Sequence, residues 1–203
     1  IFQKFIIKNL CIKIIDKFVF LGKGEYLFAC KEFERYQMKF NFIPFGIDTN
    51  FWQNNKEYDL DNRTQVLFIG NDLNRDYEFL IELVKELNDI NFTILTSQIK
   101  KNEINFENVT LIDGMWWENR VSDKEIKELY SRSILTILPL KDTLQPSGQS
   151  VALQSMISRT PVMITETKGF WDRDNFIDNK DIFFVSKNEI NLWKDNIHKL
   201  MKD

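Results

Sequence analysis

From residue 65 onward, short continuous runs of apolar residues alternate with longer segments in which apolar positions recur every three or four residues. The short runs are typical of buried strands, and the longer segments have the period of amphipathic helices. The expected strands are 65–70, 92–96, 109–112, 134–138, 162–165 and 182–185. The expected helices begin near residues 77, 122, 150 and 186. The predicted order is therefore β-α-β-β-α-β-α-β-β-α.

Strands that are apolar along their whole length are typical of a parallel sheet with helices on both faces. Right-handed crossovers are expected between such strands. The pattern thus predicts an α/β fold, a Rossmann-like doubly wound parallel sheet, over residues 65–203. Ligands of such folds bind at the carboxyl ends of the strands, so the loops that follow the strands are where binding residues are sought.

Two of the expected helices carry a sequence signal for their first turn. Ser122 and Glu125 have the S-x-x-E spacing of a capping box, and so do Ser186 and Glu189. In a capping box the serine side chain accepts from the backbone N–H three residues later, and the glutamate side chain accepts from the serine N–H. Both serines are therefore predicted to be helix N-caps.

Residues 1–43 have a different pattern, which predicts a helix, the strand 18–21, a helix from about Glu25 and a short strand at 40–43. This is too little for a domain and indicates a short remnant of a preceding one, connected by residues 44–64. Charges every few residues exclude a membrane-spanning helix at the start of the chain. Two interpretations remain for that helix: it packs against the protein, or it lies on a membrane surface.

Composition and charge narrow the function further. Lys and Arg number 27 against 30 Asp and Glu, a net charge of −3, so no nucleic-acid partner is expected. The two cysteines, Cys11 and Cys30, lack metal-binding spacing and fit a reducing, cytoplasmic compartment. The one histidine, His198, lies in the expected terminal helix, where a surface position argues against a histidine-based catalytic triad.

The loops after the first two strands of the predicted sheet contain candidate ligand contacts. Asn71 and Arg75 follow the first strand, and an arginine at a helix start, beside free backbone N–H groups, can bind a phosphate. Asp76 is placed to cap that helix. The alternative is a solvated arginine paired with Asp72 or Asp76. Thr96 and Ser97 follow the next strand and could contact a base or ribose, or form a simple strand exit.

The loop after residue 112 contains Trp116 and Trp117, which are either core residues or packing partners for a ring. The backbone of Asn119, Arg120 and Val121 is placed where main-chain groups could contact a nucleobase.

The loop at 143–149 joins the strand 134–138 to a helix. Its Gly148 permits a close approach of the backbone, and Ser147, Gln149 and Ser150 supply donors. A helix N-terminus adds about half a positive charge, so this loop could hold a diphosphate. The alternative is an ordinary serine-capped helix. The sequence has no G-x-x-x-x-G-K-[ST] or G-x-G-x-x-G motif.

Four segments resemble, in order, those of GT-B-fold glycosyltransferases, especially the retaining family 4 (glycosyl transferases group 1). They are FIPFGIDTNFW from residue 42, VLFIGNDLNRD from 66, LIDGMWWENRVSDKEIKELYSRSILTILPL from 111, and SGQSVALQSMISRTPVMITETKGFWD from 147. Together they cover most of residues 40–172. The resemblance implies the C-terminal, donor-binding half of a GT-B fold.

By this resemblance the chain binds a nucleotide-diphosphate sugar for hexosyl transfer, with retention, to a polysaccharide or glycolipid acceptor. Arg75 and residues 147–150 would contact the diphosphate, and residues 119–121 would border the base. No metal cofactor is implied, because protein groups neutralise the departing diphosphate. The missing N-terminal domain would bind the acceptor. The protein would act in the cytoplasm, with peripheral contact at the inner face of the membrane. The fragment alone is therefore expected to bind nucleotide but to transfer sugar poorly or not at all.

Three positions depart from the family pattern. The usual basic residue a few positions after Arg75 is absent, since Tyr77, Glu78 and Phe79 follow. The other two are glutamate positions, since the family commonly has one glutamate before the loop glycine and a second in E-A-M. Gln154 stands at the second position, and Gln145 or Pro146 stands near the first. Gln154 can still bond a ribose, and Gln145 a sugar hydroxyl, but without charge. Two alternatives therefore stay open: a non-catalytic nucleotide-binding or regulatory module of the same fold, and an enzyme like the sugar-nucleotide epimerases.

Overall fold

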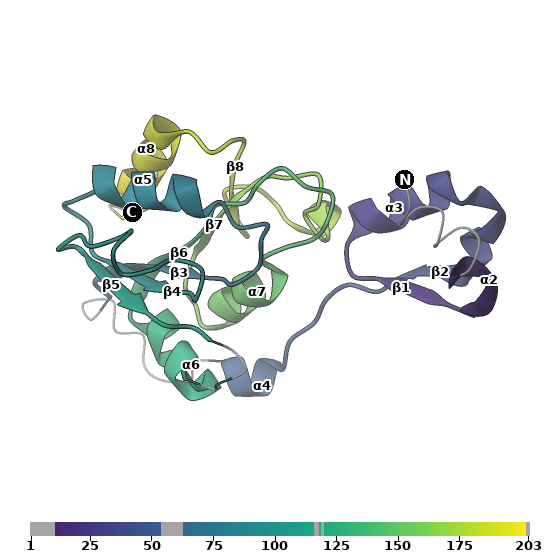
Figure 1. Ribbon diagram of the computed structural model, residues 1–203, viewed down its shortest axis with the longest axis horizontal. Coiled ribbons are helices and arrows are strands. Elements are labelled where there is room, and N and C mark those ends of the chain that lie inside the picture. Colours follow the sequence, from purple (N-terminus) through teal and green to yellow (C-terminus); the bar gives the residue numbers. More distant parts are fainter. Residues whose placement is uncertain (1–10, 54–62, 116–117, 119, 202–203) are drawn as a thin grey trace.

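The computed structural model describes residues 11–53, 63–115, 118 and 120–201. Its larger part is a six-stranded parallel sheet with helices on both faces (Figure 1). The strands are β3 (Gln65–Ile69), β4 (Phe92–Leu95), β5 (Val109–Ile112), β6 (Ser133–Leu138), β7 (Val162–Thr165) and β8 (Phe183–Val185). The helices are α5 (Tyr77–Glu86), α6 (Asp123–Ser131), α7 (Gln149–Ile157) and α8 (Ile190–Leu200). The predicted element order and the Rossmann-like α/β fold are confirmed.

The strand order is β5-β4-β3-β6-β7-β8. The chain builds outward from β3 to β5 on one side, then crosses back and builds outward from β6 to β8 on the other. The order therefore reverses between β3 and β6, and the crevice at the carboxyl ends of these two strands is where doubly wound folds bind ligands.

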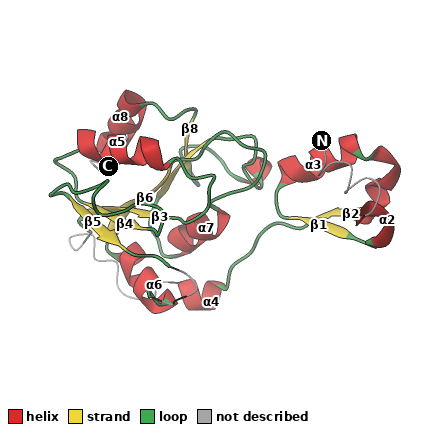
Figure 2. Ribbon diagram, in the orientation of Figure 1, coloured by secondary structure: helices red, strands yellow, loops and turns green. Residues whose placement is uncertain are grey.

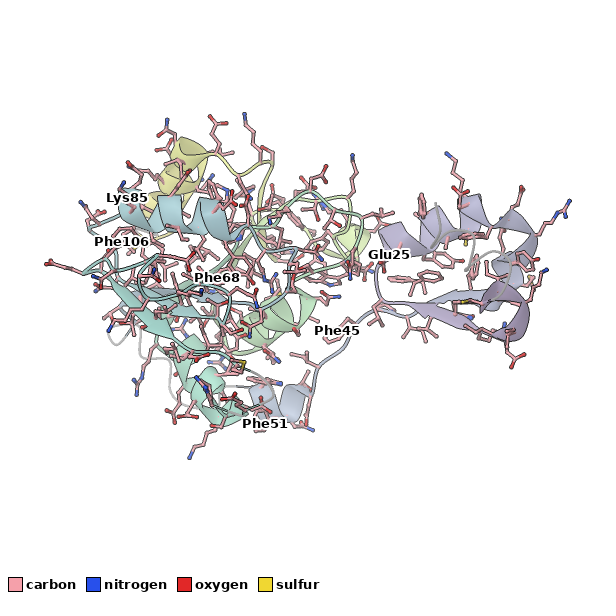
Figure 3. All side chains as sticks on the ribbon, in the orientation of Figure 1. Glu25, Phe45, Phe51, Phe68, Lys85 and Phe106 are labelled. Atoms are coloured by element: carbon pink, nitrogen blue, oxygen red, sulfur yellow. The ribbon has the colours of Figure 1, made fainter. Side chains whose placement is uncertain are left out.

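The sheet is buried on both faces because successive strand residues point to opposite sides. In β3, Val66 and Phe68 belong to the core that includes side chains of α5 and α8, whereas Leu67 and Ile69 belong to the core that includes α6 and α7. Figure 2 shows the two pairs of helices on opposite faces, and Figure 3 labels Phe68 in the layer beneath α5. Each such side chain contributes about 1.5–3 kcal/mol of burial.

The described residues up to Phe42 form a smaller part. It comprises α2 (Ile12–Ile14), β1 (Phe18–Phe20), α3 (Lys23–Glu32), the 3₁₀ helix η2 (Glu34–Lys39) and β2 (Phe40–Phe42). The connection that follows contains α4 (Thr49–Trp52), and its Trp52 packs in the core of the larger part. Strands β1 and β2 pair in parallel, over a small core that includes Ile12, Ala29 and Phe40. The helix expected at the start lies mostly outside the described residues. No helix in the described part of the chain is long and apolar enough to cross a membrane.

The turn between β1 and α3 contacts the larger part of the molecule. The Lys23 N–H donates to the Trp171 carbonyl at 2.8 Å, and the Lys23 ammonium pairs with Asp174. A Cβ on Gly22 would lie 2.9 Å from Pro146 Cγ, so only glycine permits this approach. Pro146 directly precedes Ser147 in the β6–α7 loop, and this contact therefore supports the loop from outside.

The two predicted capping boxes have different outcomes. Ser122 is the N-cap of α6, and its side chain and that of Glu125 make both capping-box hydrogen bonds. The box at Ser186 is wrong, because α8 begins at Ile190 with no side-chain cap. Asn188 explains the later start. Its amide donates to Asp76 Oδ2 at 2.7 Å and to the Leu140 carbonyl at 3.0 Å, which holds residues 186–189 against the sheet.

Candidate functional site

The β3–α5 loop is fixed against the segment that follows β6. Arg75 forms a backbone bridge with Leu140, and the Asp76 N–H donates to the Pro139 carbonyl at 3.0 Å. Asp76 is the N-cap of α5 and accepts from the Phe79 N–H at 3.3 Å, as the sequence predicts. The backbone of Arg75 is thereby held at the crevice between β3 and β6.

The Arg75 side chain is buried at this crevice, with 2% of the residue exposed. Its Nη1 donates to Ser147 Oγ at 3.1 Å, and Ser147 Oγ donates to Asp72 Oδ1 at 2.8 Å. Arg75 Nε lies 3.4 Å from Asp72 Oδ2. The alternative of a solvated arginine is therefore wrong. Its expected pairing with Asp72 or Asp76 is confirmed for Asp72. We call Asp72, Arg75, Ser147 and Gly148 the Arg75 cluster.

The guanidinium of Arg75 is incompletely hydrogen-bonded. Its Nε has no hydrogen-bond acceptor among the described residues, since the nearby Asp72 oxygen makes only an ion pair. Burial lowers the pKa of Arg75 and the Asp72 carboxylate opposes this, but a guanidinium stays charged in proteins. A buried cation with an unsatisfied donor is costly, and a bound anion would lower that cost.

Gly148 brings the N-terminus of α7 against the guanidinium. It is the N-cap of α7, its φ is +84°, and α7 has no side-chain cap. A Cβ at this position would lie 2.8 Å from Arg75 Nη1, so a glycine is required both for the backbone conformation and for the approach. The alternative of an ordinary serine-capped helix is wrong. Free N–H groups and a buried guanidinium together form an anion-binding arrangement.

Gln149 and Ser150 occupy the first turn of α7 and are half-buried. Tyr77 supports the same crevice from α5, because its hydroxyl donates to the Asp72 carbonyl at 2.9 Å. Burial raises the pKa of Tyr77 to about 12, so it is a neutral donor at physiological pH.

A second group of candidates meets at the carboxyl ends of β3, β4 and β5. Asn71 Oδ1 accepts from Thr96 Oγ1 at 3.1 Å, from the Ser97 N–H at 2.6 Å and from Ser97 Oγ at 3.0 Å. Asn71 Nδ2 donates to the Gly114 carbonyl at 2.6 Å. We call Asn71, Thr96, Ser97 and Gly114 the Asn71 cluster. Its polar groups bond one another and thereby fasten three strand ends together.

Beside this cluster is a pocket of about 260 Å³, lined by Leu95, Gly114, Met115, Val121, Ser122, Asp123 and Ile126. Val121 therefore lines a cavity, and its contact with a nucleobase stays a prediction. Arg120 is exposed and is engaged by Glu118 and Asp113. Trp116, Trp117 and Asn119 lie outside the described residues.

The two glutamines have hydrogen-bond partners outside the Arg75 cluster. Gln145 is exposed, and its N–H donates to Thr143 Oγ1 at 3.1 Å. Gln154 Oε1 accepts from the Tyr130 hydroxyl at 3.1 Å, across the contact between α6 and α7. Burial raises the pKa of Tyr130, which keeps this donor protonated. No motif in the sequence indicates Tyr130 or Asn188 as partners of candidate residues.

Within the described ranges, no three His, Cys, Asp or Glu side chains stand close enough to hold a metal ion.

Comparison with known proteins gives matches at the level of structure alone, since no family model and no curated protein sequence matches this chain. The chain is similar to HepE (Alr3699) of Anabaena, solved in complex with UDP and glucose, with a TM-score of 0.73 and 11% identity over 100% of this chain. It is similar to a glycosyltransferase from Rickettsia africae, with a TM-score of 0.72 and 13% identity over 98% of this chain.

A third solved structure corresponds to the C-terminal domain alone. It is the C-terminal domain of the glycosyl transferase group 1 family protein LpcC from Francisella tularensis, with a TM-score of 0.56 and 14% identity. The match covers 78% of this chain and 89% of that domain. By contrast, this chain spans only 58% of HepE and 56% of the Rickettsia protein. The chain therefore has the Rossmann-like fold of the C-terminal half of GT-B glycosyltransferases.

Proposed function

We propose that this chain is the donor-binding part of a glycosyltransferase. It binds the diphosphate of a nucleotide sugar at Arg75 and at the N-terminus of α7, for transfer of a hexosyl group, with retention, to a polysaccharide or glycolipid acceptor. The observation that carries the proposal is the buried, incompletely hydrogen-bonded guanidinium of Arg75 beside the uncapped α7, at the switch point of the sheet. HepE, which has the same fold, is solved with UDP and glucose.

Neutralisation of the diphosphate would come from Arg75 and the α7 N–H groups, without a metal cofactor. The base would lie on the other side of the crevice, near the pocket at Val121 and the Asn71 cluster. The donor would then extend along the carboxyl edge of the sheet from β6 to β5.

The acceptor would bind to an N-terminal domain, of which residues 1–43 are the end, with 44–64 as the connection and 65–203 as the donor domain. Exposed apolar side chains concentrate in the described part of that first segment, and they include Ile14, Val19, Leu27, Phe28 and Met38. Such side chains are what a larger domain would cover. We infer that the enzyme acts in the cytoplasm, at the inner face of the membrane where the acceptor is lipid-linked.

The test is a titration of the chain with UDP, GDP and ADP, each compared with its monophosphate. One diphosphate is expected to raise the melting temperature, since a ligand at 100 times its Kd adds about 2.7 kcal/mol of stability. Arg75→Met, which keeps a long apolar side chain in the buried position, should abolish the effect. Arg173→Met removes the same charge from an exposed position, ion-paired with Glu166, that belongs neither to the Arg75 cluster nor to the pocket at Val121, and should leave binding intact.

Two results would contradict the proposal: no stabilisation by any diphosphate, or equal stabilisation of the wild type and Arg75→Met. Sugar transfer by the chain alone at the rate of a complete enzyme would contradict the assignment of the acceptor site to a separate domain.

A second candidate is a nucleotide-binding module without transferase activity. It is favoured by Gln154, whose side-chain oxygen is engaged by Tyr130. A donor domain should bind the nucleotide sugar with an affinity that depends on the sugar, whereas such a module should bind the diphosphate and its sugar conjugates equally.

A further inference from the structure

Asp72 is the solvent-exposed member of the Arg75 cluster. Its side chain is 44% exposed, whereas that of Arg75 is 3% exposed. Asp72 Oδ1 accepts from Ser147 Oγ at 2.8 Å, and Asp72 Oδ2 lies 3.4 Å from Arg75 Nε. An anionic group of the protein itself therefore already stands beside the guanidinium and holds the hydroxyl of Ser147.

We propose that Asp72 is an internal anion that occupies the phosphate position at Arg75, and that a ligand must displace it. The inference rests on the proposed function, because it concerns the same site. Asp72 is then a specificity-determining residue. A ligand can form contacts with Arg75 and Ser147 only if it binds these side chains more strongly than the Asp72 carboxylate does. A diphosphate, with more charge and more acceptor oxygens, meets this condition better than a monophosphate.

The contacts of the cluster favour displacement of Asp72 over movement of Arg75. The exposed carboxylate can exchange its hydrogen bonds from Ser147 and from the Asn74 N–H for bonds to water, which limits the net cost of moving it. The backbone of Arg75, by contrast, is fixed by the bridge to Leu140, and its side chain is buried. A phosphate oxygen in the position of Asp72 could also accept from Arg75 Nε, which the carboxylate leaves without a hydrogen bond.

Asp72→Asn tests the inference with little change of shape. The amide oxygen can still accept from Ser147 and from the Asn74 N–H, which donates to Asp72 Oδ1 at 3.0 Å, so the loop keeps its bonds while the negative charge is removed. Inorganic pyrophosphate, inorganic phosphate and UDP are titrated calorimetrically into the wild type and the variant. Pyrophosphate and UDP should bind about tenfold tighter to the variant, a change of about 1.4 kcal/mol. Phosphate should gain more, so that the preference for pyrophosphate falls.

Asp142→Asn is the matched control. Asp142 lies in the segment between β6 and α7, its side chain is 70% exposed, and it pairs with Lys168 at 3.7 Å. The Asp142→Asn substitution changes the net charge by the same amount as Asp72→Asn. Because Asp142 is exposed, solvent and salt screen its charge, so the affinity for pyrophosphate should change by less than about twofold. Asp72→Ser, with a short uncharged side chain that can accept from the Asn74 N–H, should behave as Asp72→Asn does.

The outcomes separate the inference from the proposed function. Equal or weaker binding of pyrophosphate and UDP by folded Asp72→Asn and Asp72→Ser, while the wild type binds, overturns the inference alone. A gain in Asp142→Asn as large as in Asp72→Asn also overturns it, since net charge would then be the cause. No binding of any of these ligands by any of the proteins overturns both.

Discussion

The carboxyl edge of the sheet carries two polar clusters that are built in opposite ways. In the Arg75 cluster, a buried cation faces an exposed carboxylate, and the guanidinium keeps an unsatisfied donor. In the Asn71 cluster, neutral groups satisfy one another, because one amide oxygen accepts three hydrogen bonds and the amide nitrogen donates a fourth. Both clusters follow neighbouring strands, so their place in the fold does not explain the difference.

The difference separates binding from stability. A satisfied neutral network stabilises the folded state and has little to gain from a ligand. A buried charge with incomplete partners contributes little net stability and gains from an added anion. Substitutions in the Arg75 cluster should therefore lower diphosphate affinity, whereas substitutions in the Asn71 cluster should lower the free energy of unfolding and leave that affinity nearly unchanged.

Gly148→Ala is expected to have the largest effect, because it alters both the backbone and the guanidinium. A φ of +84° costs a non-glycine residue about 1–2 kcal/mol, and the new Cβ would lie 2.8 Å from Arg75 Nη1. Urea denaturation should give a loss of about 2–3 kcal/mol of unfolding free energy, and calorimetry should give a loss of diphosphate affinity of about a hundredfold. Gly46→Ala is the control, since its Cβ would meet nothing within 4 Å. Retained affinity in Gly148→Ala would contradict the site.

Asn71→Ala should lower the free energy of unfolding and leave the affinity for pyrophosphate nearly unchanged. It leaves the Ser97 N–H and the Gly114 carbonyl without their partner, and losing a buried partner costs about 1–3 kcal/mol. We expect unfolding free energy to fall by about 2 kcal/mol, with the Kd for pyrophosphate within about threefold of the wild type. A selective loss of pyrophosphate binding, with stability unchanged, would mean that the two clusters are not separate in function.

Asn188→Ala should cost less stability than either substitution, with an effect on affinity between the two. The Asn188 amide joins Asp76 to the end of β6, and its oxygen accepts from Thr165 Oγ1 at 2.6 Å. Its removal should cost about 1–2 kcal/mol of stability. Diphosphate affinity should fall about threefold, because the loop that holds Arg75 is less constrained. A loss of stability with no change in affinity would show that Arg75 is positioned without this network.

Local and periodic signals explain what the sequence predicts. Continuous apolar runs identify all six strands of the main sheet, and the Ser122 box identifies the start of α6. These two predictions need only the period of the pattern and a local motif. A common site for Arg75 and residues 147–150 is implied by the family resemblance alone. The structure brings Arg75 to Ser147 because β3 and β6 are neighbours whose carboxyl ends share one edge.

The sequence does not predict which side chains from distant segments form hydrogen bonds with one another. The Ser186 box fails because Asn188 is held by Asp76 and Leu140, far away in the chain. The engagement of Gln154 by Tyr130 depends on how α6 and α7 pack. The burial of Arg75 depends on glycine at two positions, since a Cβ on Gly70 would lie 2.4 Å from Arg75 Nε. None of these contacts has a local signature.

Ser97→Ala should have the smallest effect, and it tests whether the Asn71 cluster is redundant. The substitution removes one of the three hydrogen bonds to Asn71 Oδ1, but the Ser97 N–H at 2.6 Å and Thr96 Oγ1 at 3.1 Å remain. Since the amide oxygen stays satisfied, the loss of unfolding free energy should be under about 1 kcal/mol, with no change in pyrophosphate affinity. A loss as large as that of Asn71→Ala, measured in the same urea titration, would mean that the hydroxyl and not the backbone N–H fastens β4 to β3. The neutral cluster would then depend on a single bond, as the charged cluster depends on a single guanidinium.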